Sequence, residues 1–458
     1  MNPDTYSARR NALRTAVPEG AILIMGNQEA PRNYVDNPYP FRQDSHFLYY
    51  AAANRAGLAL LIEPDGRSIL LGTPEHRDDV VWFGPHETLE DLAAAAALTE
   101  VGDIGALGAR LEELANGAVT VHFLPPYRAQ RRFTVARLLG LDPREVAAQT
   151  SVELVTAVAA QRSVKEEVEI SEIEDAVAVT SLMYRATMRA ARAGLTEARV
   201  AAAHQMEAVA RDRSQAFSPI VTVAGEVLHN TSYANTLRDG DLLLVDSGAE
   251  SPHFYASDIT RTMPVSGRFT EQQREVYEVV LAANEAAIAA ASPERTNREL
   301  HLLAARTVAA GLKDIGLMQG NVDDAVAAGA HALFFVHGLG HMMGLDVHDM
   351  EDLGDVVGYE KGEERSSQFG LAYLRLARKL EPGFVITIEP GIYFIPALID
   401  RWKADGMHRD FIRYDRLEAY REFGGIRIED DVLITETGSR VLGPAIPKRV
   451  NDVEKAMA

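Results

Sequence analysis

The sequence predicts an α/β protein with two domains: a smaller α/β domain at residues 1–156 and a larger α+β domain at residues 157–458 that contains an internal repeat. The chain has 458 residues, which is too many for one ordinary domain. Runs typical of strands and of helices alternate along it, and two segments of the second half share one pattern. Hydrophobic residues make up 47% of the chain and charged residues 24%, as in a globular protein.

In the first domain, short apolar runs predict strands at residues 21–26, 57–64 and 68–72, with a Pro-Asp-Gly turn between the last two. Residues 90–115 are rich in alanine and leucine, which predicts a helix. A polar, charge-rich helical stretch begins near residue 163, and we place the domain boundary just before it.

In the second domain, residues 170–213 predict an alanine-rich pair of helices that is broken at residues 194–196. Further helices are expected at 270–291 and 297–315. Strand composition recurs in five later segments: residues 218–225, 241–248, 256–265, 383–395 and 425–438.

Two of these segments repeat one pattern. Residues 238–248 and 381–391 each carry a turn glycine, an apolar run, a carboxylate and then a glycine. Each half then supplies a second carboxylate, Asp258 or Glu429, at the same offset before a later glycine. The repeat predicts two carboxylate pairs related by a pseudo-twofold axis.

The net charge of the chain excludes some classes of binding partner. The formal net charge is -20 and the pI about 5.1, an excess that repels nucleic acid and anionic membranes. We therefore expect no nucleic-acid partner and no membrane partner, and a small neutral or zwitterionic substrate, or a cation. The N-terminal residues show no apolar signal segment, and no run reaches the ~18 apolar residues of a membrane span, so a cytoplasmic protein is expected.

The chain contains no cysteine. Disulfides, thiolate metal sites and a cysteine nucleophile are therefore excluded. Any metal must be held by His, Asp and Glu, which favours manganese, cobalt or zinc.

Three carboxylates stand where buried strands should lie. Asp246, Glu389 and Glu429 each follow a run rich in apolar residues. A buried carboxylate is costly unless it is paired or binds a metal. Any one of them alone could be an acid at the solvent-facing end of a strand, but their repeated context favours a shared metal site.

Residues 337–349 (HGLGHMMGLDVHD) carry His337, His341 and His348. Gly338 and Gly340 argue against a helix through the first two histidines, so a turn or strand is expected and only one of the pair need be a ligand. A lone histidine in such a setting is usually structural, but three among glycines favour a site. Two metal ions held by carboxylates and an imidazole suit hydrolysis of an amide or ester, and further histidines can stabilise an oxyanion.

At these residues the sequence resembles the pita-bread metallopeptidase superfamily and, within it, the prolidase and aminopeptidase P branch. The resemblance covers essentially the whole chain, including residues 39–50 and 82–85 near the N-terminus. It is carried by five strings: LLLVDSG at 242–248, ASDITRTMPVSGRFT at 256–270, HGLGHMMGLDVHD at 337–349, VITIEPGIYFI at 385–395 and GGIRIEDDVLITETG at 424–438.

The resemblance implies a pita-bread catalytic domain with a pseudo-twofold repeat, behind a smaller α/β N-terminal domain. It implies two divalent metal ions per subunit, most often manganese with zinc or cobalt as alternatives, and a homodimer or homotetramer. By position, Asp258 and Glu429 would bridge the two ions, Asp246 would complete one, and His341 with Glu389 the other.

The same resemblance implies roles for other residues around the metal. Glu389 would relay protons for a bridging hydroxide, and His348 would polarise the scissile carbonyl. His229 and His337 would line the proline side of the pocket, and His337 would also be a catalytic residue. Arg427 would support the site and contact the substrate.

Two departures from the family pattern bear on the site. The stretch before His229 is shorter than the usual glycine-rich one, which leaves the shape of the substrate pocket open. Asp246 and Asp258 are separated by one residue more than is common, which a bulge or a longer turn at residues 251–253 could absorb.

The implied activity is hydrolysis of the Xaa-Pro bond at the N-terminus of small proline-containing peptides. We favour a Xaa-Pro dipeptidase because Arg375, in residues 370–378, matches the prolidase arginine that holds the substrate carboxylate. Against this, residues 39–47 and 82–85 resemble aminopeptidase P, which acts on longer peptides, and Arg375 could be a surface-loop arginine. Creatinase-like and non-catalytic relatives lack part of the ligand set, whereas all five ligands are present here.

Overall fold

The computed structural model describes residues 1–74, 76 and 78–458. These residues form two compact units. The N-terminal unit comprises residues 1–162 together with 351–356, and the C-terminal unit comprises the remainder. The boundary expected between residues 156 and 157 falls inside helix α7 (Val152–Ser163).

The N-terminal unit is built on a mixed five-stranded sheet in the order β4-β3-β2-β1-β5. Its strands are β1 (Ala21–Met25), β2 (Ala59–Ile62), β3 (Ser68–Gly72), β4 (Glu100–Asp103) and β5 (Val121–Phe123). Its helices besides α7 are α1 (Pro3–Ala16), α2 (Ser45–Ala51), α3 (Asp79–Phe83), α4 (Leu89–Ala95), α5 (Leu107–Asn116) and α6 (Ala129–Leu139). Leu111 of α5 packs on Leu23 and Leu61 of the sheet, which forms the core of this unit.

The prediction of one helix over residues 90–115 is wrong in its middle. Helix α4 ends at Ala95, and Ala97 takes a left-handed φ of 51°. Strand β4 follows and pairs in parallel with β3 before α5 begins. Composition rich in alanine and leucine does not exclude a short edge strand, because strand formation depends on the neighbour that pairs with it.

The C-terminal unit contains the long helices that the sequence predicts. They are α8 (Glu167–Ala190), α9 (Glu197–Val209), α10 (Glu271–Ala290) and α11 (Asn297–Asp314), followed by α12 (Val322–Ala328), α13 (Pro396–Asp405) and α14 (Val450–Met457). The threonines Thr196, Thr270 and Thr296 cap the N-termini of α9, α10 and α11 by accepting a hydrogen bond from a backbone N–H of the first turn. Among the described residues, no helix combines the length and apolarity needed to cross a membrane.

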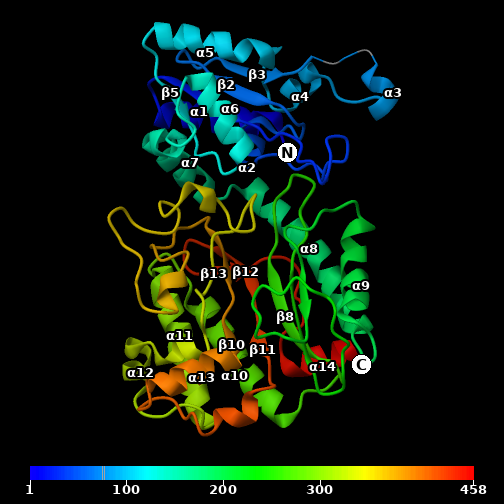
Figure 1. Ribbon diagram of the computed structural model, residues 1–458, viewed down its shortest axis with the longest axis vertical. Coiled ribbons are helices and arrows are strands. Elements are labelled where there is room, and N and C mark those ends of the chain that lie inside the picture. The colour runs from blue at the N-terminus through cyan, green and yellow to red at the C-terminus, as the bar shows by residue number, and fades with distance from the viewer. Residues whose placement is uncertain (75, 77) are drawn as a thin grey trace. The chain divides into compact units, whose positions relative to one another are not determined.

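The strands of this unit form two three-stranded sheets and one two-stranded ribbon. The first sheet has the order β6 (Ile220–Thr222), β7 (Leu242–Ser247), β8 (Ile259–Pro264). The second has the order β13 (Ser439–Val441), β12 (Asp430–Ile434), β9 (Val385–Ile388), and β10 (Gly391–Tyr393) pairs with β11 (Gly425–Arg427). Figure 1 shows these strands between the α8–α9 pair and the α10–α11 pair.

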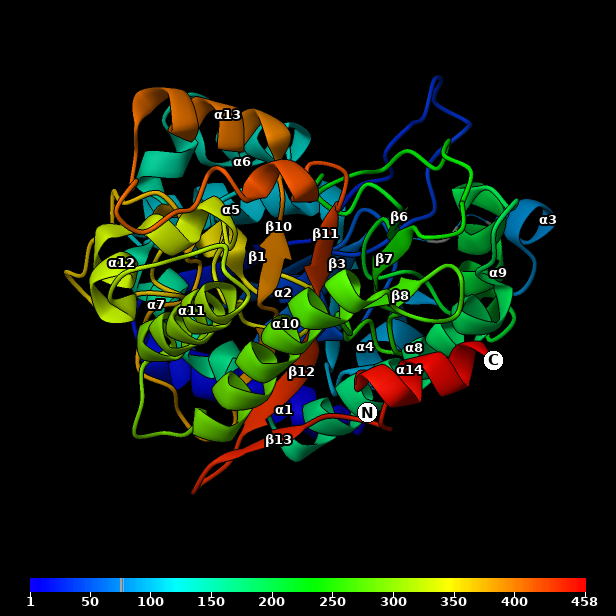
Figure 2. The same cartoon turned by 90° about the horizontal axis from the view of Figure 1, so that it is seen from below.

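The two halves of this unit repeat one arrangement, as the sequence pattern predicts. Each half supplies a pair of long helices and then an antiparallel sheet, and Figure 2 shows α10 and α11 side by side. Tyr184 on α8 donates a hydrogen bond to the Val245 carbonyl of β7 at 3.0 Å. In the matching place, Asn284 on α10 donates to the Ile388 carbonyl of β9 at 3.0 Å. A buried polar side chain thus ties each helix pair to its sheet.

The halves meet where β8 passes β12. The Glu429 N–H donates to the Thr260 carbonyl at 3.1 Å, so the second carboxylates of the two halves lie beside each other. Between Asp246 and Asp258 the chain turns at residues 251–255, where Phe254 takes a φ of 68°.

One pair of neighbouring histidines is buried in this unit. His301 on α11 and His331 are fully buried, with ring centroids 6.3 Å apart. Neither nitrogen of either ring has a hydrogen-bond partner among the described residues. Burial lowers the pKa of His301 to about 3 and that of His331 to about 4.

These two histidines are expected to make the protein acid-sensitive. The unfolded chain, with an ordinary imidazole pKa of about 6.5, binds more protons than the folded chain between that pH and the lowered pKa. Stability therefore falls as the pH falls through this window, by about 2 kcal/mol per histidine at about pH 5. Phenylalanine keeps a ring at this position but binds no proton. Between about pH 7.5 and 5, the unfolding temperature of His301→Phe should therefore fall less than that of the unmodified chain. Calorimetry with a chelator present measures this, and equal losses would contradict it.

Candidate metal centre

A cavity of about 660 Å³ lies in the C-terminal unit. Its lining contains every side chain that the sequence analysis assigns to the site: Asp246, Asp258, His341, Glu389, Glu429, His229, His337, His348, Arg375 and Arg427. The structure therefore brings together residues that are spread along the chain from His229 to Glu429. Phe217, Ile220, Val336, Phe369 and Leu398 supply apolar walls.

The strands explain how the carboxylates converge. Asp246 lies on β7 and Asp258 directly precedes β8, while Glu389 follows β9 and Glu429 directly precedes β12. Each pair therefore comes from two neighbouring antiparallel strands, and the contact between Thr260 and Glu429 joins the pairs.

The histidine segment lies extended against β9 rather than forming a helix. The Thr387 N–H donates to the His341 carbonyl at 3.0 Å, and the Glu389 N–H donates to the Leu339 carbonyl at 2.8 Å. A Cβ atom at Gly340 would stand 1.9 Å from the Thr387 oxygen, so only glycine permits this approach. The expected absence of a helix through His337 and His341 is confirmed.

His341 is held in the tautomer that a metal ligand needs. Its Nδ1 donates to the Met342 carbonyl at 3.0 Å, which leaves Nε2 as the acceptor. That Nε2 stands 3.4 Å from Asp258 Oδ2 and 4.0 Å from Glu389 Oε1. One ligand atom each of Asp258, His341 and Glu429 lies within 4.8 Å of the others, and all three residues are buried.

Arg427 organises the other side of the cluster. It forms an ion pair with Asp246, its Nε donates to the Thr260 hydroxyl at 3.1 Å, and its Nη1 donates to the Tyr393 hydroxyl at 2.8 Å. The Thr260 hydroxyl in turn donates to Glu429 Oε2 at 2.6 Å. Sequence reasoning missed Thr260 and Tyr393, although both lie inside the recognised strings at 256–270 and 385–395. Thr260 lies two residues after Asp258, a spacing that places both side chains on one face of an extended chain.

Burial strongly disfavours the charged forms of the clustered carboxyl groups. Desolvation and repulsion from neighbouring carboxylates raise the pKa of Asp258 and of Glu429 well above the usual range. Desolvation raises the pKa of Glu389 to about 8, with Arg427 opposing the rise. Oδ1 of Asp246 and Oδ1 of Asp258 are buried without a hydrogen-bond partner among the described residues. This hard oxygen and imidazole set fits divalent cations.

The remaining histidines surround this cluster. His337 donates from Nδ1 to the Gly338 carbonyl and accepts at Nε2 from the Tyr393 hydroxyl, both at 2.8 Å. Burial and the nearby Arg427 lower the pKa of His337 to about 3, so this ring is neutral. The ring of His348 lies over that of His341, with centroids 4.0 Å apart.

Comparison with known proteins identifies the family. Residues 171–436 match metallopeptidase family M24, and residues 6–122 match the aminopeptidase P N-terminal domain. The chain belongs to metallopeptidase family M24. It is 31% identical to a Xaa-Pro dipeptidase of Homo sapiens over 97% of this chain and 90% of that protein. It is also 31% identical to a Xaa-Pro aminopeptidase of Escherichia coli (strain K12), over 99% and 97%.

Solved structures of similar fold agree with this membership. Proline aminopeptidase P II from Yersinia pestis superposes with a TM-score of 0.83 at 30% identity, over 100% of this chain and 99% of that one. The predicted pita-bread fold and N-terminal domain are thereby confirmed, and the chain is a metallopeptidase. The M24 family implies divalent metal ions, for which the clustered carboxylates and His341 provide fitting donors.

Replacing Gly340 tests the close approach of the histidine segment to β9. Gly340→Ala should displace His341, because the new Cβ would overlap the Thr387 oxygen. We expect bound metal, measured by mass spectrometry on protein purified with manganese, to fall about tenfold or more, since misplacing one ligand weakens a metal site at least as much as losing a supporting contact. Gly438→Ala is the matched control, because a Cβ there meets nothing within 4 Å. Full metal content in Gly340→Ala would refute the constraint.

The neighbouring carboxyl groups of Glu429 and Asp430 have pKa values that are shifted in opposite directions. Burial and repulsion raise the pKa of Glu429, whereas Arg261 and Lys448 outweigh burial and lower the pKa of Asp430 to about 2. Glu429→Gln should therefore raise the unfolding temperature of the metal-free protein and abolish the further rise on adding metal. Asp430→Asn should keep that response but destabilise the protein by about 3 kcal/mol, since it leaves buried cations without their counterion. Thermal unfolding with and without manganese measures both, and parallel behaviour of the two variants would contradict this contrast.

Proposed function

We propose that the chain is a metal-dependent exopeptidase that hydrolyses the Xaa-Pro bond of short peptides, with Xaa-Pro dipeptides as its favoured substrates. The observation that carries the dipeptide preference is the position of Arg375, which lines the same cavity as the metal-ligand candidates. The relatives are named Xaa-Pro dipeptidase and Xaa-Pro aminopeptidase, and these names support the assignment of the Xaa-Pro bond as the one that is cleaved.

Five residues would hold two divalent ions, most simply manganese: Asp246, Asp258, His341, Glu389 and Glu429. When bound, such ions supply an activated water nucleophile and neutralise charge that develops on the attacked oxygen. The orphaned buried oxygens of Asp246 and Asp258 support this assignment, because each lacks another partner among the described residues.

The remaining groups would bind and orient the peptide. Glu389 would accept a proton from the attacking water, since its carboxyl lines the cavity beside the other ligand candidates. His348 would donate a hydrogen bond to the oxygen of the scissile carbonyl. His337 and His229 would pack against the proline, and the neutral state of His337 suits an apolar ring.

Arg375 would bind the free carboxylate of a dipeptide. Its charge opposes the rise in the pKa of Glu389 and contributes to the lowered pKa of His337, so it stands within electrostatic reach of both. In a Xaa-Pro dipeptide the carboxylate belongs to the residue directly after the scissile bond, and a guanidinium fork matches its geometry. A tripeptide would place an amide where the carboxylate otherwise lies.

The second candidate is a Xaa-Pro aminopeptidase that acts on longer peptides. The structural likeness to an aminopeptidase P over the whole chain favours it. On this alternative, Arg375 would be a rim residue without a defined role in binding, because no free carboxylate would reach it.

Truncating Arg375 distinguishes these candidates. Arg375→Ala should raise KM for Ala-Pro at least about tenfold, since a charge-assisted bidentate contact is worth roughly 1.5 to 3 kcal/mol, and change KM for Ala-Pro-Ala far less. Arg378→Ala is the control, because Arg378 pairs with Glu381 and does not line the cavity. Steady-state assays of the manganese-loaded enzyme, with a chelated blank, give both constants. Equal effects on the two substrates would remove the carboxylate role from Arg375.

We also propose that the chain assembles into a homodimer or homotetramer. Helix α3 exposes Val80, Val81 and Trp82 by 53%, 72% and 80%, and adjacent exposed apolar side chains are typical of contact surfaces. Trp82→Ala should lower the molecular mass measured by light scattering after gel filtration. An unchanged mass would exclude this surface from assembly.

A further inference from the structure

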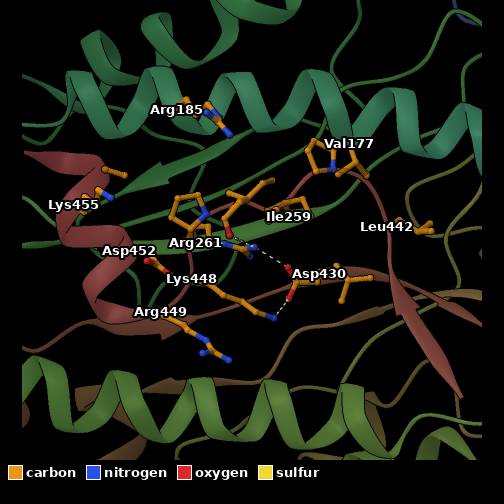
Figure 3. Close-up of a pocket in the computed structure, with 16 residues that line it drawn as sticks. Val177, Arg185, Ile259, Arg261, Asp430, Leu442, Lys448, Arg449, Asp452 and Lys455 are labelled. Atoms are coloured by element: carbon orange, nitrogen blue, oxygen red, sulfur yellow. Dashed lines mark hydrogen bonds and ion pairs between the residues drawn. The ribbon is translucent and has the colours of Figure 1, made fainter.

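A second cavity of about 660 Å³ lies in the C-terminal unit, apart from the candidate active site. Figure 3 shows the residues that line it, which come from α8, β8, β12, β13, α14 and the chain between β13 and α14. It is as large as the first cavity and shares no lining residue with it.

The two cavities lie on opposite faces of the same strand segments. Successive side chains of an extended chain point to opposite faces. Glu429 lines the first cavity, and the next residue, Asp430, lines the second. In the same way, the Thr260 hydroxyl contacts Glu429 on the metal side, while Arg261 lines the second cavity.

The floor of the second cavity is an ordered ionic network. Arg261 Nη2 donates to Asp430 Oδ1 at 2.7 Å, and Lys448 Nζ donates to Asp430 Oδ2 at 2.6 Å. Arg261 Nη1 also donates to the Glu429 carbonyl at 2.7 Å. Figure 3 shows both side chains pointing toward Asp430. Both Asp430 oxygens are thus engaged, and this one negative charge offsets only one of the two positive charges that contact it.

Two further cations stand at the rim. Arg185 extends from α8 and Lys455 from α14, and both are exposed. Within the part of the chain that the structure describes, neither side chain has an ion pair or hydrogen bond. Arg449 reaches Glu285 at 3.1 Å, but both partners are solvent-exposed, and such surface pairs contribute little.

The charge of this lining is opposite to that of the chain. Five cationic side chains, Arg185, Arg261, Lys448, Arg449 and Lys455, face two carboxylates, Asp430 and Asp452, an excess of three positive charges. The whole chain carries a net charge of -20. The rest of the wall is apolar, with Val177, Ile259, Leu442, Pro444, Ile446 and Pro447 among its residues.

We propose that this cavity is a binding site for a small organic anion with an apolar body, such as a carboxylate, sulfonate or phosphate ester. Its volume lies within the roughly 300 to 1,000 Å³ of small-molecule sites, which combine apolar walls with a few converging polar groups. A hollow with an excess of one sign of charge concentrates counter-ions, and an exposed guanidinium group suits carboxylate and phosphate oxygens. Arg261 uses its guanidinium donors on protein acceptors, so it attracts the anion through its fixed positive charge. The exposed rim cations Arg185 and Lys455 would supply the direct contacts.

The test uses 8-anilinonaphthalene-1-sulfonate, an anion with an apolar aromatic body, titrated by fluorescence into the metal-loaded full chain at low salt. We expect saturable binding, and a dissociation constant that rises about tenfold or more in Arg185→Glu with Lys455→Glu, because two rim cations become anions. N-phenyl-1-naphthylamine, which lacks the sulfonate, should bind equally to both proteins. Arg375→Ala should leave the sulfonate affinity unchanged. Unchanged peptidase activity shows that the charge-reversed protein is folded, since both positions are exposed and outside the active site.

Hydrogen exchange locates the probe. Bound sulfonate should slow exchange of backbone amides in residues 441–458, and leave residues 337–349 of the candidate active site unaffected. Absence of saturable binding, an affinity that survives the double charge reversal, or protection confined to residues 337–349 would each overturn the proposal.

Discussion

The repulsion among carboxylates that are crowded into one cavity is the constraint on which the catalytic unit depends. Asp258 and Glu429 are buried beside each other, and Asp246 and Glu389 lie close by. Within this cluster, Arg427 forms an ion pair with Asp246. A fold that brings these groups together therefore stores unfavourable electrostatic energy, which divalent ions relieve. This packing fits the divalent ions that the M24 family implies.

The internal repeat explains how such a costly cluster can be built. Each half supplies one carboxylate near the end of a strand and another beside its antiparallel neighbour, and the halves join where Glu429 meets Thr260. His341 is added by a segment that can lie against β9 only because Gly340 has no side chain. Tyr184 and Asn284 tie the two helix pairs to the strands, so the cluster rests on a framework fixed from both sides.

On the other face of the same strands, a buried carboxylate is stabilised by cationic side chains of the protein itself. Asp430 is neutralised within the protein by Arg261 and Lys448, and its pKa is lowered, whereas that of the adjacent Glu429 is raised. Arg261 also holds the Glu429 backbone carbonyl. Because successive side chains of a strand point to opposite faces, the crowded carboxylates around Glu429 lie on one face and the ion-paired Asp430 lies on the other. The cationic cavity on this face arises because its network leaves a positive excess.

The sequence by itself determined the long helices, most strands, the repeat and the chemistry of the metal ligands, because these depend on local periodicity and residue type. It failed at residues 100–103, where an edge strand forms only because β3 pairs with it. Only the tertiary structure decided that Thr260 and Tyr393 join the site and that Asp430 faces a second cavity. Desolvation and ion pairing depend on neighbours that are distant in sequence, so the pKa and the partners of a side chain follow from the folded packing rather than from its local pattern.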